Sequence, residues 1–278
     1  VSLVNVKELL RKAKEGRYGV GAFNVGNMEM VLGVIKAAEK NSSPAIMQIA
    51  ESRLKTSPLH VVGPMMVAAA KAASVPVAVQ FDHGHSMELI RQALEIGFSS
   101  IMIDASSKPL EENIAIVKEV QKLAAGYGAT VEAEVGQLAG DEGEGEKERF
   151  YSDPEDVRRL YESTGVDAIA LSFGNAHGLY KSKPCLEYSI LQRASKVPVP
   201  LVLHGGSGIS PDDFRKCVAE GISKINIATA GFMAVEAGAR QYMEEEEKNY
   251  FVLTRLMAES VEKTTSEHME IFGSIGKA

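Results

Sequence analysis

Residues 75–86 read VPVAVQFDHGHS, an apolar run that ends in an acid, a histidine, a glycine and a second histidine. A short apolar run of this kind, bounded by turn-forming residues, is consistent with a strand buried on both faces. Asp and Gly end many strands for backbone reasons alone. The stretch therefore predicts a buried strand whose carboxyl end either turns or presents chemically active side chains.

Apolar runs of the same kind recur along the chain, and helical periodicity follows each of them. Near-continuous apolar strands that alternate with helices indicate a parallel sheet with helices on both faces. Eight such units in 278 residues predict an α/β fold, the (β/α)8 TIM barrel, with additional C-terminal helices. The expected strands are Tyr18–Asn24, Pro44–Ala50, Pro76–Asp82, Phe98–Asp104, Thr130–Gly136, Asp167–Phe173, Val199–His204 and Ser223–Ala228.

Helix signals between these strands support the barrel. Residues 27–40, for example, have an apolar helical face that includes Met28 and Leu32. A doubly wound open sheet is the alternative, but no GxGxxG motif follows the first strand, so a dinucleotide site is not expected there. No linker or low-complexity segment divides the chain, and we expect one domain over residues 1–278.

Charge and composition narrow the function classes. The formal net charge of −7 argues against a general nucleic-acid binder. No apolar run is long enough to span a bilayer, and the first residues lack a signal pattern, so we expect no membrane association. The two cysteines form no CxxC motif and indicate neither a disulfide framework nor a thiolate zinc site. We therefore expect a cytoplasmic protein.

Polar residues gather at the carboxyl ends of the expected strands, where the loops of a barrel converge. His83, His177 and His204 lie at the ends of the third, sixth and seventh strands, and each precedes a glycine. A lone histidine at a strand end is more often structural, but three imidazoles on one rim suit Zn²⁺ and leave its fourth position open. Other polar residues near these ends are Asn24, Asp82, Asp104, Glu132, Glu134, Asn226 and Thr229.

Two loops predict a phosphate site. Residues 204–210, HGGSGIS, and residues 226–229, NIAT, place small or hydroxyl-bearing residues at the start of a helix. Helix N-termini attract anions, and the loops after strands seven and eight form the usual phosphate site of such barrels. Gly-Gly alone would be an ordinary turn, but two such loops on neighbouring strands favour phosphate.

A metal, a phosphate site and carboxylates together indicate proton transfer next to a carbonyl, where a Lewis acid stabilises an enediolate. A lysine Schiff base is the other way to supply an electron sink. Lys108, Lys181 and Lys183 fall in expected loops, and Lys224 opens the eighth strand at the opposite rim. The metal route is therefore favoured.

Seven segments occur in a characteristic order: VGAFNVGNMEM (20–30), FDHGHS (81–86), MIDASS (102–107), EAEVG (132–136), GNAHGLY (174–180), LHGGSGI (203–209) and KINIAT (224–229). This ordered set covers nearly the whole chain and resembles the class II, metal-dependent ketose-bisphosphate aldolases. The resemblance implies a (β/α)8 barrel and a homodimer or homotetramer. It also implies reversible cleavage of fructose or tagatose 1,6-bisphosphate to dihydroxyacetone phosphate and glyceraldehyde 3-phosphate.

The resemblance assigns metal ligands. His83, His177 and His204 match the three histidines that hold the catalytic zinc. Asp104 and Glu134 match a second divalent-metal site, or an alternative position of a mobile zinc.

The resemblance also assigns the acid/base and the substrate site. Asp82 matches the acid/base that exchanges a proton with the C4 hydroxyl, and Glu142 matches a glutamate that moves the C3 proton. Gly178 and the Gly205–Ser207 loop match a site where some members hold Na⁺ or K⁺. The residues expected to bind dihydroxyacetone phosphate are Asn24, Gly178, Gly205, Gly206, Ser207, Asn226, Ile227, Ala228 and Thr229.

The chain departs from the family pattern where the aldehyde half of the substrate would bind. Ala50 stands where the family usually has serine, and residues 248–253, KNYFVL, replace an Asp-Pro-Arg segment whose arginine holds the distal phosphate. Arg53 and Arg255 are candidate replacements, although neither matches the family position. The histidine that commonly follows MIDASS is also absent. Glyceraldehyde 3-phosphate is the aldehyde that the family pattern implies. The departures favour an alternative in which the dihydroxyacetone-phosphate half is intact and the aldehyde differs.

Two other function classes stay open at the level of sequence. A metal-dependent isomerase or epimerase would use the same enediolate without breaking a C–C bond. A barrel that senses a sugar phosphate or a metal would need no acid beside the metal ligand. Asp82 favours catalysis over sensing for that reason.

Overall fold

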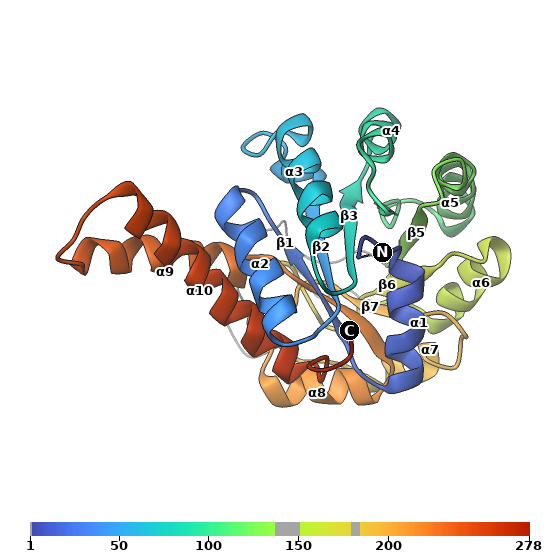
Figure 1. Cartoon of the computed structure of the whole chain (residues 1–278). Helices are drawn as coiled ribbons and strands as arrows, with labels where there is room; N and C mark the ends of the chain where they lie inside the picture. Colours follow the sequence, from blue (N-terminus) through green and yellow to red (C-terminus); the bar gives the residue numbers. More distant parts are fainter. Residues whose placement is uncertain (1, 137–150, 179–183) are drawn as a thin grey trace.

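A computed structural model describes residues 2–136, 151–178 and 184–278 of the chain. Eight parallel strands close into a barrel in chain order, with helices around the outside (Figure 1). The strands are β1 (Val20–Asn24), β2 (Ala45–Ala50), β3 (Val77–Gly84), β4 (Ser100–Ile103), β5 (Thr130–Val135), β6 (Ala168–Leu171), β7 (Leu201–Leu203) and β8 (Ile222–Ile227). The predicted (β/α)8 barrel is thus confirmed, and every expected strand is present to within two residues at each end.

The helices that follow the strands bury apolar faces against the sheet. The alternation of apolar strand-like runs with segments of helical hydrophobic periodicity predicts this arrangement. Asn27, Ser86, Asp153 and Ser210 each cap a helix by accepting a hydrogen bond from a backbone N–H of its first turn. The helices are α1 (Val6–Gly16), α2 (Met28–Lys40), α3 (Leu59–Ala72), α4 (Met87–Ile96), α5 (Leu110–Ala125), α6 (Pro154–Thr164), α7 (Tyr188–Ala194), α8 (Pro211–Ala219), α9 (Thr229–Glu244) and α10 (Tyr250–Ile271), with a 3-10 turn, η1 (Glu51–Arg53).

The amino-terminal end of the barrel is closed by α1. Leu9 and Leu10 of this helix form one apolar cluster with Val20, Ile46 and other small residues of the barrel interior. Burial of such side chains stabilises the fold by about 1.5–3 kcal/mol each. Because this end is sealed by apolar contacts, the open end is the carboxyl rim, where the predicted site residues lie.

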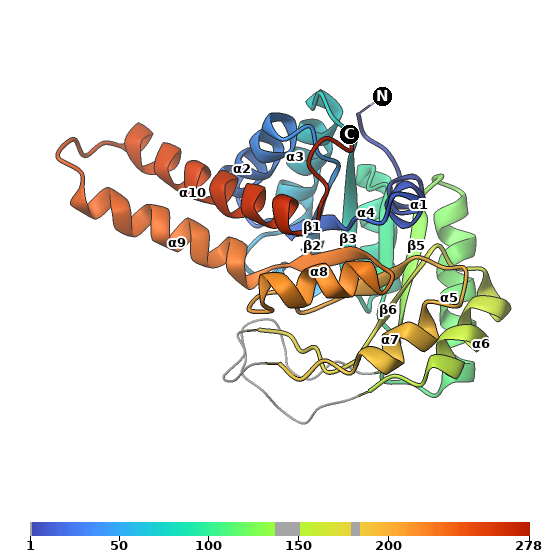
Figure 2. The ribbon, with the colours of Figure 1, turned by 90° about the horizontal axis from the view of Figure 1, so that it is seen from below.

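The C-terminal helices α9 and α10 form an antiparallel hairpin that projects from the barrel (Figure 2). The C-terminal half of α10 packs against α2. Gly33 of α2 allows this close approach, because a Cβ at this position would lie 2.6 Å from Val261. The predicted apolar face of α2 therefore matches the buried face of this helix only in part. Met28 and Leu32 remain 47% and 42% exposed, because the buried side of the helix is set by both the barrel and α10. Across the described ranges, no helix has the length and apolarity needed to cross a membrane.

Candidate active site

The end of β3 carries a local irregularity that positions two neighbouring side chains. In a regular strand, Asp82 and His83 would point to opposite faces. Between Phe81 and Gly84 the pairing of β3 with β4 shifts its register, and His83 adopts a φ of 44°, in the left-handed region. A bulge of this kind re-aims a side chain, and such strain is tolerated where the surrounding structure holds it. Both side chains consequently face the open end of the barrel.

The three histidines predicted to bind zinc converge on this point. The ring centroid of His83 lies 4.9 Å from that of His177 and 4.7 Å from that of His204. One nitrogen of each ring lies within 4.8 Å of the others. Asn175 helps to hold this arrangement, since its amide donates a hydrogen bond of 3.0 Å to the backbone carbonyl of His204 and so fixes the loop after β6 to β7.

Several buried polar atoms here lack a hydrogen-bond partner in the described part of the chain: His83 Nε2, His204 Nδ1 and Glu134 Oε2. His204 Nδ1 and Glu134 Oε2 approach to 3.1 Å without hydrogen-bond geometry. Leaving such atoms unpaired is costly, and a bound cation would satisfy them together. Two imidazole nitrogens and a carboxylate oxygen, with His177 beside them, are a donor set that fits Zn²⁺.

Asp104 lies next to this set and orients one ligand. Its Oδ2 is 2.9 Å from His83 Nδ1, while its Oδ1 accepts hydrogen bonds from the backbone and side chain of Ser106. A carboxylate on the outer nitrogen fixes both the tautomer and the orientation of a ligating histidine. Asp104 also groups with His83 and Glu134 as a second set of atoms that could hold a metal.

The carboxylates make this region favourable for positive charge. Burial acts to lower the pKa of His83, but Asp82 and Asp104 together raise it to about 10. Burial raises the pKa of Glu134, with a further contribution from Asp104, and burial lowers the pKa of His177 well below its ordinary value. Such a site binds protons or a metal cation in competition, so its metal affinity depends on pH.

Asp82 is fully buried and held by two side-chain amides. Its Oδ2 accepts a hydrogen bond of 3.0 Å from Gln48, and its Oδ1 accepts one of 3.4 Å from Asn226. Gln48 also donates to Asn24 at 2.6 Å. Asn24, expected at the substrate site, is therefore linked to Asp82 through Gln48 and is buried. The sequence analysis did not single out Gln48, although a polar residue in an otherwise apolar strand is a signal for it.

A second buried network lies below the histidines. Lys224 is fully buried and its ammonium lies 2.9 Å from Glu132 Oε2, while Glu132 Oε1 lies 2.8 Å from His204 Nε2. Burial acts to raise the pKa of Glu132, but Lys224 lowers it to about 2. Lys224 starts near the closed end of the barrel, yet its side chain extends inside the barrel toward the rim. The sequence analysis assigned no role to either residue.

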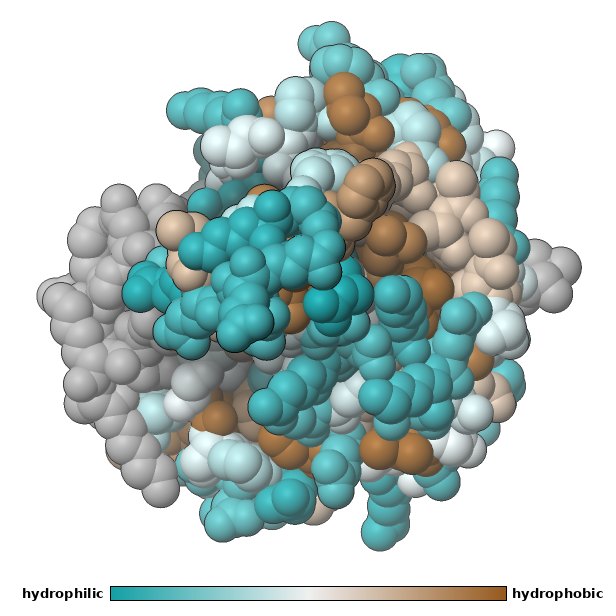
Figure 3. Space-filling view, turned by 60° about the vertical axis from the view of Figure 1, so that its left-hand side comes forward, coloured by the Kyte–Doolittle hydropathy of each residue, from teal (hydrophilic) through white to brown (hydrophobic). Residues whose placement is uncertain are grey.

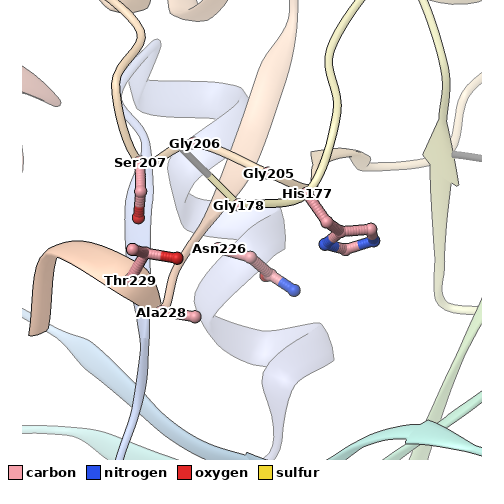
Figure 4. Close-up of a pocket in the computed structure, with 8 residues that line it drawn as sticks. All are labelled: His177, Gly178, Gly205, Gly206, Ser207, Asn226, Ala228 and Thr229. Carbon is pink, nitrogen blue, oxygen red and sulfur yellow. The ribbon is translucent and has the colours of Figure 1, made fainter. Parts of the chain in front are cut away.

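The predicted phosphate loops line one pocket beside the histidines (Figure 4). Ser207 and Thr229 present hydroxyls on one side, and the imidazole of His177 lies on the other. Gly205 is required by geometry: its φ is +68°, and a Cβ would lie 2.0 Å from the carbonyl oxygen of Ala176. The lining residues are His177, Gly178, Gly205, Gly206, Ser207, Asn226, Ala228 and Thr229.

Among the described residues predicted to bind substrate, Asn24 and Ile227 do not line this pocket. Ile227 is 1% exposed and packs in the apolar layer between sheet and helices, so only its backbone remains available to a ligand. Glu142 lies outside the described residues.

The rim above β2 is different in composition. Ala50 is buried at the end of the strand, opposite Asp82 in the register of β2 and β3. Glu51 accepts hydrogen bonds from the backbone N–H groups of His85 and Ser86, at 2.7 and 3.0 Å, which fixes the loop after β3. The guanidinium of Arg53 lies 5.4 Å from the centroid of the Phe232 ring in α9.

Arg255, the other candidate for a distal phosphate, lies on α10. It pairs with Glu259 one turn further along the same helix, at 3.0 Å. It is therefore part of the projecting hairpin, whereas Arg53 belongs to the rim.

Comparison with known proteins agrees with this geometry. The family model "Fructose-bisphosphate aldolase class-II" matches residues 4–277. A fructose-bisphosphate aldolase of Thermus caldophilus is 39% identical, with 99% of this chain and 100% of the relative covered. A 6-phospho-5-dehydro-2-deoxy-D-gluconate aldolase of Bacillus subtilis is 38% identical, with 100% and 98% covered.

Solved structures give the same result. The crystal structure of the YdjI aldolase from Escherichia coli K12 superposes with a TM-score of 0.89 at 35% identity, and the match covers 99% of both chains. The fold, the order of the site segments and these matches agree over the whole chain, which is an aldolase, and hence a lyase, of the class II fructose-bisphosphate aldolase family.

Proposed function

We propose that this aldolase is zinc-dependent and cleaves a ketose 1,6-bisphosphate reversibly to dihydroxyacetone phosphate and an aldehyde. One observation carries the proposal: His177 belongs both to the converging histidines and to the lining of the phosphate-loop pocket. A substrate phosphate in that pocket would put the neighbouring carbonyl beside the metal ligands. When bound, zinc would act there as a Lewis acid on the carbonyl oxygen.

The chain's own groups would then move the protons. Asp82 is buried beside His83 and is held by Gln48 and Asn226, so its carboxylate has a fixed direction. We assign to it the proton exchange with the C4 hydroxyl, and to Glu142 the exchange at C3. General acid–base catalysis by a positioned carboxylate contributes typically about 10²–10⁴-fold to a rate.

We assign two further cation sites more broadly. Asp104 and Glu134, with His83, would hold a second divalent metal or an alternative zinc position. Gly178 and the Gly205–Ser207 loop would hold Na⁺ or K⁺ beside the phosphate.

A different aldehyde partner is the second candidate, and the rim above β2 favours it. Ala50 offers no hydroxyl, and the Asp-Pro-Arg segment is absent. One relative is named for a phosphorylated sugar acid instead of a bisphosphate. Cleavage of fructose or tagatose 1,6-bisphosphate with a kcat/KM of about 10⁴ M⁻¹s⁻¹ or more, an ordinary value for enzymes, would exclude this candidate.

The experiment that tests the shared half of the mechanism is proton exchange. The purified protein is incubated with dihydroxyacetone phosphate in D₂O, and loss of the C3 proton signal is followed with and without a chelator. Exchange that disappears with chelator and returns with Zn²⁺ is expected. No exchange in metal-replete protein would contradict the proposal and favour a sugar-phosphate sensor.

We also propose a homodimer or homotetramer acting as a single-domain unit in the cytoplasm. The α9–α10 hairpin supports self-association, since Met243, Tyr250 and Phe251 near its tip are 65%, 65% and 78% exposed. Figure 3, with this side turned forward, shows a largely hydrophilic protruding surface with apolar residues scattered beside it. Light scattering on the purified protein measures the oligomeric state, and a monomer at micromolar concentration would contradict the proposed dimer or tetramer.

The free thiols of Cys185 and Cys217 suit the reducing environment of the proposed cytoplasmic location.

A further inference from the structure

Lys224 is the buried cation of the barrel interior, and the proposed reaction gives it no step. Its ammonium lies 2.9 Å from Glu132 Oε2 and donates a hydrogen bond of 2.7 Å to Asn226 Oδ1. Both residues of the ion pair are essentially inaccessible to solvent, at 0% and 1% exposure. A buried ammonium is maintained only when it is paired and hydrogen-bonded. The pair is therefore a fixed unit of the interior, and its position beside His204 calls for an explanation.

Glu132 connects Lys224 to the zinc-ligand histidine His204. Its second oxygen lies 2.8 Å from His204 Nε2, and Gln80 donates a further bond of 3.2 Å to the oxygen that faces Lys224. An ionised carboxylate only accepts hydrogen bonds, and the contact of Nε2 with Glu132 has hydrogen-bond geometry, whereas Glu134 lies 3.1 Å from Nδ1 without it. The proton of a neutral His204 therefore lies on Nε2. Its Nδ1 then keeps the lone pair, and Nδ1 is one of the buried atoms without a hydrogen-bond partner among the described residues.

The same ammonium acts on the acid/base. Because Lys224 occupies Asn226 Oδ1, the NH₂ group of Asn226 is left to face Asp82 Oδ1 at 3.4 Å. The ammonium of Lys224 thus acts on two groups of the site: on His204 through Glu132, and on Asp82 through Asn226.

We propose that Lys224 and Glu132 are positioning residues that fix the tautomer of His204 and hold its Nδ1 toward the metal. The inference rests on the proposed zinc-dependent function. It also accounts for a second feature of the interior: Asp82, Glu132 and His204 have ligand atoms close enough to hold a metal. The ammonium already neutralises that deeper group, so a metal ion is directed to the outer set of histidines.

The test measures zinc affinity without turnover. Apo-protein is titrated with Zn²⁺ in competition with a chromophoric chelator for wild type, Glu132→Gln, Lys224→Met and the double variant. In Glu132→Gln, the single amide oxygen cannot accept from both Lys224 and His204. Lys224→Met leaves a buried carboxylate without its cation, and the double variant removes both charges, so it is the variant to use if the single ones do not fold. Ser43→Ala is the matched control, since Ser43 is equally buried and its hydroxyl contacts Pro44 and Ser274 instead of the Lys224–Glu132 network.

Loss of a partner that orients a metal ligand typically costs about 10–100-fold in metal affinity. We expect at least a tenfold loss in each folded variant that lacks Glu132 or Lys224, and a change of less than about twofold in Ser43→Ala. Histidine ¹⁵N spectra of apo-protein should report the Nε2–H tautomer of His204 in wild type, identified by its loss in His204→Gln, and an altered tautomer in Glu132→Gln.

Wild-type zinc affinity and an unchanged tautomer in folded Glu132→Gln, or in the double variant, would overturn the positioning role. Wild-type protein that binds no zinc would instead overturn the proposed function, so the two failures can be distinguished.

Discussion

The rim above β3 to β8 and the rim above β1 and β2 are built differently. The first brings together three histidines, their carboxylates and the phosphate loops, and its positions depend on the bulge at His83 and the φ of Gly205. The second has the buried methyl group of Ala50 and a short turn in which Arg53 stacks near Phe232. The described site residues of the first rim are held by strand ends and by buried hydrogen bonds. Most of the second is a loop.

This difference indicates that the two rims have different functions, catalysis on the first and recognition of the aldehyde on the second. Chemistry that needs precise geometry is placed on rigid elements, whereas recognition of a variable substrate group tolerates a loop. On this view, changes to the metal and phosphate sites of the first rim should affect every reaction of the enzyme, and a change to a proton-transfer group there should affect its own step. Changes on the second should affect only reactions that involve the aldehyde.

Removal of the metal should have the largest effect on the first rim. We expect chelator-treated protein to lose both proton exchange on dihydroxyacetone phosphate and C–C cleavage by at least about 10³-fold, because the Lewis acid supplies several kcal/mol of charge stabilisation. Both activities are followed in the same preparation, and Zn²⁺ is then added back. Activity that survives exhaustive chelation would contradict a metal role on this rim.

Substitution of Asp82 should separate the two reactions. Asp82→Ala removes the group assigned to the C4 hydroxyl, so cleavage should fall by about 10²–10⁴-fold, the usual contribution of an acid/base. Proton exchange at C3 should continue, since we assign it to Glu142, and zinc should remain bound. Zinc content, exchange and cleavage are measured on one sample, and undiminished cleavage would remove Asp82 from the mechanism.

The convergence of polar residues on the first rim could be predicted from the sequence for a physical reason. Strand ends in a closed barrel converge, so polar residues such as His177 and His204, each followed by glycine, could be assigned to one site before any coordinates. The bulge that turns both Asp82 and His83 inward could not be predicted, because a regular strand places neighbours on opposite faces. The contact of Lys224 with Glu132 could not be predicted either, since the length of its side chain carries the charge from the closed end of the barrel to Glu132.

Gly205→Ala should have a smaller effect on activity than the two changes above. The effect arises from the backbone, because the added Cβ meets a neighbouring carbonyl group. The added Cβ would lie 2.0 Å from the carbonyl oxygen of Ala176, in addition to the strain of a φ of +68°. We expect a loss of about 1–3 kcal/mol in stability, and a KM for dihydroxyacetone phosphate raised about tenfold as the two loops separate. Thermal denaturation and exchange kinetics measure these quantities.

Gly128→Ala is the matched control for this change, since Gly128 has the same φ of +68° but nothing within 4 Å of the added Cβ. Its cost should be limited to backbone strain, about 1–2 kcal/mol, with an unchanged KM. If both variants lose the same stability and keep the same KM, the contact with Ala176 has no part in forming the phosphate site.

Arg53→Ala should affect the narrowest set of reactions and so gives the clearest view of the second rim. If the guanidinium at Phe232 holds an anionic group on the aldehyde, its loss should lower kcat/KM for cleavage or condensation by about tenfold, because charge-assisted bonds from arginine are among the strong ones. Exchange on dihydroxyacetone phosphate alone should be unchanged. Arg255→Ala, which breaks only the exposed pair with Glu259 on the hairpin, is the control and should leave both reactions intact. The activities of the Arg53 variant toward phosphorylated, carboxylated and uncharged aldehydes are then compared to identify the charged group that this rim binds. An equal loss of activity with all three aldehydes would mean that Arg53 stabilises the loop and does not bind the substrate.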